Sequence, residues 1–134
     1  MQDLLARESR SLVQRLRLWT PARFAAQAPT HGTRGDLVHH LAQRLADQAA
    51  DAEGLPRRPL PRLDGDLVLP DQLAVTADDL ARTGDAAAAR AATAHLLLHR
   101  HDLLEEEVPP GLAQALELDD VLAAGREECG RRTQ

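Results

Sequence analysis

Helical periodicity constrains this chain more than any other feature of its sequence. Apolar residues recur three and four positions apart in separate stretches, which predict helices over residues 3–18, 34–52, 71–83 and 85–106. Proline and glycine stand between these stretches, where helices are expected to end. A fifth, shorter helix, or two half-helices, is expected over residues 112–129. The pattern predicts an all-α fold.

The amino-acid composition favours the same fold class. Ala, Leu and Arg dominate the sequence, and these side chains lose little conformational freedom in a helix. Trp19 and Phe24 are the only aromatic residues and β-branched residues are scarce, so a sheet would have little to be built from. We attribute the excess of Ala, Arg and Leu, and the absence of Lys, to the coding bias of a GC-rich genome.

Residues 55–70 contain four prolines and a glycine and predict a long extended or polyproline-like connection between the second and third helices. The stretch "DLVL" within it, residues 66–69, could add a few strand-like residues. Four amphipathic helices with one long connection predict a single-domain four-helix up-and-down bundle over residues 1–134, in which helices pack close to antiparallel. Bundles of this kind build metal sites from side chains on facing helices.

Charge and hydropathy exclude several classes of partner. The formal net charge of −5 argues against a nucleic-acid-binding protein, which needs a concentrated basic surface. No apolar run approaches the roughly 20 residues of a membrane span, and the charged N-terminus does not resemble a secretory signal. Cys129 is the one cysteine and is interpreted as an incidental thiol. We therefore expect a cytoplasmic protein with no membrane or nucleic-acid partner.

The stretch "HLLLHRHDL", residues 95–103, carries three of the six histidines. His95 and His99 are four residues apart on one face of the predicted helix, a spacing that lets two imidazoles reach one metal ion. Asp102 falls on the same strip, whereas His101 points to nearly the opposite side and is interpreted as a bystander. The alternative is that the pair is a surface or packing feature, and the metalloprotease pattern H-E-x-x-H is absent.

A third ligand would have to come from another helix, and the second predicted helix offers His39 and His40. Adjacent residues on a helix diverge by about 100°, so at most one of them is expected to face a shared site, and periodicity does not choose between them. His31 lies in the glycine-containing segment "APTHGTRGD" and is interpreted most simply as a solvated loop residue.

Two stretches of the chain resemble a known family. "TRGDLVHHLAQRLAD" (33–47), followed after a long gap by "AHLLLHRHDLLEE" (94–106), is similar to the DinB-like helical bundles, and in particular to the N-terminal domain of the mycothiol-dependent maleylpyruvate isomerases. The pair Trp19–Thr20 also resembles a segment of that family. The order of helices matches over about residues 1–106, and the specific part of the resemblance is these short stretches.

The resemblance implies a metal site and the residues that form it. The first ligand falls on His40, because His-Leu-Ala is shared with the family, and the other two fall on His95 and His99. Three histidines are the pattern of the broader DinB-like and thiol-transferase members, whereas the isomerases commonly have Glu at the position of His95. His39 would lie behind a ligand or face solvent. Asp102 could accept a hydrogen bond from His99 or from a bound water, or could be a solvated acid.

The resemblance also implies an activity. Three imidazoles on a divalent ion, Zn or Ni, leave an open coordination position that in the family serves a low-molecular-weight thiol, mycothiol or bacillithiol. The expected function is metal-dependent thiol transfer or isomerisation of a small molecule. Arg44, one turn after His40, could bind an anionic group such as a carboxylate, or be a surface residue. The alternative is a non-catalytic bundle that has lost the metal and acts as an interaction or ligand-binding module, with alanine-rich faces that could support a homodimer.

Overall fold

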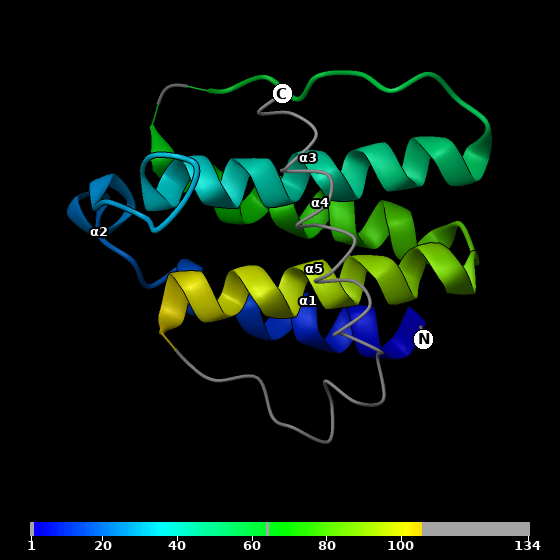
Figure 1. The fold of residues 1–134 in the computed structure, drawn as a ribbon, viewed down its shortest axis with the longest axis horizontal. Coiled ribbons are helices and arrows are strands. Elements are labelled where there is room, and N and C mark those ends of the chain that lie inside the picture. Colours follow the sequence, from blue (N-terminus) through cyan, green and yellow to red (C-terminus); the bar gives the residue numbers. More distant parts are fainter. Residues whose placement is uncertain (1, 64, 106–134) are drawn as a thin grey trace, which may run out of the picture.

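The computed structural model describes residues 2–63 and 65–105, which form an all-α structure (Figure 1). Within these residues there is no strand, and the one isolated β-bridge joins Gln27 to Thr33. The all-α prediction is confirmed, while the helix expected over 112–129 and Cys129 lie outside the described residues. The elements are α1 (Gln2–Leu16), α2 (Pro21–Ala25), α3 (Arg34–Glu53), the 3-10 turn η1 (Asp66–Val68), α4 (Leu69–Arg82) and α5 (Ala86–Leu104).

Local interactions fix the ends of α3. The Thr33 hydroxyl accepts from the backbone N–H of Asp36 at 3.0 Å, and the Asp36 carboxylate accepts from the backbone N–H of Thr33 at 3.1 Å. This reciprocal pair is a capping box, which satisfies donors left open in the first helical turn. At the other end Gly54 adopts φ 70°, a left-handed conformation that glycine reaches at little cost.

The short helix α2 was not predicted. The sequence indicated that a helix ends near Trp19–Thr20–Pro21, and α1 does end shortly before it, at Leu16. A new helix then begins at once, because the Thr20 hydroxyl accepts from the backbone N–H of Arg23 and Pro21 fits the first helical turn. Phe24 on α2 is buried, with its ring centroid 5.1 Å from that of Trp19. Five residues are too few for a helical period to be recognised.

The four long helices bury a shared apolar core. Helix α1 packs against α4 and α5, and α3 packs against the same two helices. The apolar positions that predicted the helices are the ones that face inward. The leucines with no exposed surface are Leu5, Leu12, Leu16, Leu37, Leu41, Leu45, Leu69, Leu73, Leu80, Leu96 and Leu103. None of the described helices is long and apolar enough to cross a membrane.

The proline-rich connection runs backward along the outside of α3 (Figure 1). Gln43 contacts the backbone of Arg58 and Leu60, His39 contacts the carbonyl oxygen of Leu60, and Arg62 reaches Asp36. Residues further along the connection therefore contact residues earlier in α3. The described residues of this segment before η1 form no helix or strand.

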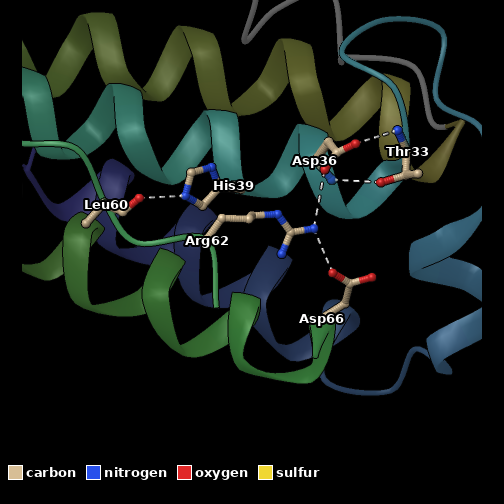
Figure 2. A network of polar contacts seen from close by, with 6 residues as sticks. All are labelled: Thr33, Asp36, His39, Leu60, Arg62 and Asp66. Carbon is tan, nitrogen blue, oxygen red and sulfur yellow. Dashed lines mark hydrogen bonds and ion pairs between the residues drawn. The ribbon is translucent and has the colours of Figure 1, made fainter. Parts of the chain in front are cut away.

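This path sets the direction of the next helix. Arg62 bridges the carboxylates of Asp36 and Asp66, at 3.4 and 2.7 Å (Figure 2). Asp66 also lies against Gly35, where an added β-carbon would come within 3.0 Å of its carboxylate. The chain has returned to the start of α3 when α4 begins, so α3 and α4 run parallel. The expected up-and-down order, which requires consecutive helices to be antiparallel, does not hold for this pair, because the connection spans the length of α3. The stretch 66–69 forms η1 and the start of α4 rather than strand-like residues.

Candidate functional site

Three imidazoles from different elements meet where the beginning of α3 faces the second half of α5. His31 comes from the loop before α3, His40 from α3 and His99 from α5. The His31 and His40 rings are stacked, with centroids 4.0 Å apart and planes at 27°. The His99 ring stands edge-on to both, with centroids 5.7 Å from His40 and 6.2 Å from His31. We call these three residues the histidine cluster.

His99 is the buried member of the cluster. Its side chain is 6% exposed, and its Nδ1 has no hydrogen-bond partner among the described residues. Burial, and to a smaller extent the nearby charges of His40, His95, His31 and Arg44, together lower the pKa of His99 from 6.5 to about 3. The imidazole is therefore neutral near pH 7, which is the form that binds a metal ion or accepts a proton.

The two adjacent histidines of α3 point to different surroundings. His40 is half-buried and belongs to the histidine cluster. His39 Nε2 lies 3.1 Å from the carbonyl oxygen of Leu60, to which it donates a hydrogen bond (Figure 2). Helical periodicity left the choice between them open, and the structure turns His40 toward α5 and His39 toward the proline-rich connection.

His95 and Arg44 form a polar pair beside the cluster. Arg44 Nη2 lies 2.8 Å from His95 Nε2. A guanidinium can only donate, so Nε2 is the acceptor and the ring proton of a neutral His95 sits on Nδ1. Arg44 thus donates to His95 on the facing helix, and its expected role in binding an anionic group stays a prediction. The Nε2 lone pair of His95 is engaged by this hydrogen bond.

Asp102 lies one turn beyond His99, beside a second polar region. Together with Gln27, Arg34, His101 and Glu105 it lines a surface hollow of about 440 Å³. Arg34 lies 3.6 Å from the Glu105 carboxylate, and its guanidinium lies 6.0 Å from the centre of the Trp19 ring. The expected role of Asp102 as a hydrogen-bond acceptor for His99 stays a prediction. His101 is exposed.

The side chains of the site are not arranged around a metal position. Within residues 2–63 and 65–105, no three His, Cys, Asp or Glu side chains form a group ready to hold a metal ion. The stacking of His31 on His40 explains part of this, since two rings that lie face to face do not direct their in-plane lone pairs at one point. Metal binding would require at least one ring to rotate about its side-chain bonds.

Sequence reasoning missed the position of His31. The residue is exposed, as expected for a loop, yet its ring covers His40. Its backbone is left-handed, with φ 66°, and the following Gly32 has φ 85°. The sequence Thr-His-Gly is compatible with a sharp turn of the chain. A loop has no regular period, however, so the sequence does not predict the direction of the His31 side chain.

No protein-family model, curated protein or solved structure matches this chain. A functional proposal therefore has to rest on the geometry of the histidine cluster and of the Arg44–His95 pair.

Proposed function

We propose that this protein is a DinB-like four-helix bundle that binds a divalent metal ion, Zn²⁺ or Ni²⁺, through His40, His95 and His99. The buried His99 carries the proposal, because its Nδ1 has no partner among the described residues while its ring faces other imidazoles. Leaving a buried polar atom without a partner costs about 1–3 kcal/mol. A metal ion bound there would recover that energy.

The donor set suits such an ion. Neutral imidazole nitrogens are common ligands of Zn²⁺ and Ni²⁺, and the facing helices α3 and α5 supply them here. His40 and His99 already lie with ring centroids 5.7 Å apart. His95 lies one helical turn before His99 and would have to exchange its hydrogen bond with Arg44 for the ion. The site therefore fits the metal after side-chain rotation.

The proposed activity is thiol transfer or isomerisation in the cytoplasm, with a small-molecule substrate and a mycothiol- or bacillithiol-type thiol. His40, His95 and His99 would hold the divalent ion, which would lower the pKa of a water or thiol that reaches it. Arg44, once released from His95, would hold an anionic group of the substrate, such as a carboxylate, through paired N–H donors. Asp102 would orient His99 or a bound water. His39 would keep the proline-rich connection against α3 through Leu60.

A second candidate function follows from the Arg44–His95 hydrogen bond. This bond satisfies one of the proposed ligand nitrogens from within the protein. Together with the absence of a ready metal group in the described residues, it favours a bundle without catalysis that binds a small molecule or a second copy of itself.

Metal analysis distinguishes the two candidates. The purified full-length protein and the His99→Leu variant would be assayed for bound Zn and Ni, with the exposed His101→Leu on the same helix as a control. We expect one metal ion per chain in the native protein and in the control, and none in His99→Leu. An ion present at 100 times its Kd should also stabilise the native protein by about 2.7 kcal/mol. A native protein whose melting temperature does not respond to Zn²⁺ or Ni²⁺ would contradict the metal function.

A thiol assay addresses the chemistry separately. The metal-loaded protein should conjugate or isomerise an electrophilic substrate in the presence of mycothiol or bacillithiol, and the EDTA-treated protein should not. Metal binding without any thiol-dependent turnover would support a binding role only.

A further inference from the structure

The loop that precedes α3, residues 26–33, is closed by backbone hydrogen bonds. The N–H of Ala28 donates to the carbonyl of Gly32 at 2.8 Å, and the N–H of Arg34 donates to the carbonyl of Ala26 at 2.8 Å. The bridge between Gln27 and Thr33 lies between these two bonds. The loop is thereby joined directly to the capping box of α3 at Thr33. Its position relative to His40 is set by these backbone hydrogen bonds together with the capping box.

His31 stands at the turn of this loop in a conformation that few residues adopt. Its φ of 66° is left-handed, a region unfavourable for residues with a β-carbon, although His, Asn and Asp enter it more often than others. Such outliers persist where the surrounding structure holds them, and they gather at functional sites. Here the conformation places the His31 imidazole over the ring of His40.

The ring of His31 is oriented from both sides. Its Nδ1 lies 2.9 Å from the hydroxyl oxygen of Thr30, and its face stacks on His40. A histidine ligand of a metal ion usually has its other ring nitrogen engaged in such a hydrogen bond, which fixes the tautomer and the ring plane. The Thr30 contact leaves Nε2 as the ring nitrogen that can take a further partner.

We propose that His31 is a metal ligand, which the loop 26–33 brings to an ion shared with His40 and His99. The inference rests on the proposed metal function and changes its ligand set. His31, His40 and His99 already form one cluster from three elements, with centroids 4.0 to 6.2 Å apart. His95, by contrast, has its Nε2 occupied by a guanidinium, whose positive charge opposes a cation at that nitrogen. Rotation of the stacked rings would present two nitrogens beside that of His99, and the loop would cover the ion.

Zinc titration of metal-free variants tests this ligand set. His31→Asn removes the imidazole and keeps a residue that tolerates the left-handed backbone. His95→Asn removes the competing ligand, and His101→Asn is the matched control on an exposed histidine. The full chain is stripped with EDTA, and Zn²⁺ affinity is measured by calorimetry. We expect His31→Asn to weaken binding by about 100-fold or more, since even a residue that only orients a ligand is worth 10–100-fold. Thr30→Val, which removes only the hydroxyl beside His31 Nδ1, should weaken Zn²⁺ binding by about 10–100-fold. His101→Asn should bind Zn²⁺ like the native protein.

The outcomes separate this inference from the proposed function. Weaker Zn²⁺ binding by His31→Asn supports His31 as a ligand, whether or not His95→Asn also binds Zn²⁺ more weakly. Native affinity in His31→Asn with loss in His95→Asn overturns the inference and leaves the proposed ligand set standing. No zinc binding by the native protein overturns both. Melting of each variant in EDTA shows whether it is folded; if His31→Asn is destabilised, His31→Gly, which also accepts φ 66°, replaces it.

Discussion

Arg44 on α3 donates a hydrogen bond of 2.8 Å from Nη2 to Nε2 of His95 on α5. The two residues are 51 positions apart in sequence, and each lies one helical turn from a member of the histidine cluster, His40 or His99. In the ligand set that includes His95, the guanidinium and a metal ion would therefore compete for the same nitrogen. Whether the site holds a cation or an internal hydrogen bond depends on the balance between them.

Removing the guanidinium should favour the metal. Arg44→Met keeps an apolar side chain of similar length, frees His95 Nε2 and removes a positive charge from the site. We expect Zn²⁺ affinity to rise by about tenfold, which corresponds to the roughly 1.4 kcal/mol scale of such a hydrogen bond. Arg82→Met, on the exposed surface of α4, removes the same charge far from the cluster and serves as the control in the calorimetric titration. Unchanged or weaker affinity in Arg44→Met would show that Arg44 does not compete with the ion.

The burial of His99 should make the metal-free protein sensitive to acid. The unfolded chain protonates His99 below pH 6.5, whereas the folded protein resists protonation until the lowered pKa of about 3. The unfolded state therefore binds more protons between these values, and the free energy of unfolding should fall by up to about 1.4 kcal/mol per pH unit as the pH decreases. Urea unfolding in EDTA measures this slope.

His99→Leu is the control for the acid sensitivity. Leucine cannot be protonated and leaves no buried nitrogen without a partner, so the variant should be at least as stable as the native protein at pH 7. The free energy of unfolding of this variant should depend less on pH between pH 6.5 and about pH 4, because it lacks the imidazole that is protonated there in the unfolded chain. The pKa of Asp36 is lowered from 3.8, so the stability that its carboxylate contributes is lost only below that range. Equal slopes in the two proteins would contradict a neutral, buried His99.

Gln43 should hold the proline-rich connection against α3. Its side chain donates to the carbonyl oxygen of Arg58 at 3.0 Å and accepts from the backbone N–H of Leu60 at 2.6 Å. Gln43→Ala should lower the free energy of unfolding by about 1–3 kcal/mol, since both bonds are lost at once. Trypsin should then cut faster after Arg57 or Arg62; it does not cut after Arg58, because Pro59 follows. Gln14→Ala, on the exposed face of α1, should be cleaved at the native rate.

The capping box should stabilise the start of α3 and, with it, the loop that carries His31. Thr33→Ala removes the hydroxyl that accepts from Asp36 N–H and should cost about 1 kcal/mol in thermal unfolding. Thr33→Ser retains the oxygen and should remain near the native stability. If the loop positions a ligand, Thr33→Ala should also weaken Zn²⁺ binding more than Thr33→Ser does. Equal Zn²⁺ affinities in the two variants would show that the capping box does not contribute to metal binding.

The sequence by itself determined the long helices. Their apolar periods depend on interactions within a few residues, and the structure has a helix in each of the four predicted ranges. The same local geometry placed His95 and His99 on one face of α5. These predictions succeed because a helix is specified by hydrogen bonds three and four residues apart and by one apolar stripe.

The tertiary structure alone decided how these parts meet. The parallel course of α3 and α4, the turning of His40 rather than His39 toward α5, the stacking of His31 and the pairing of Arg44 with His95 all depend on contacts between segments far apart in the chain. His39 and His40 flank the same stripe, so which one faces a neighbour is set by where α5 and the proline-rich connection pack. The sequence supplies the imidazoles, and the packing of α3 against α5 determines which of them can share a ligand.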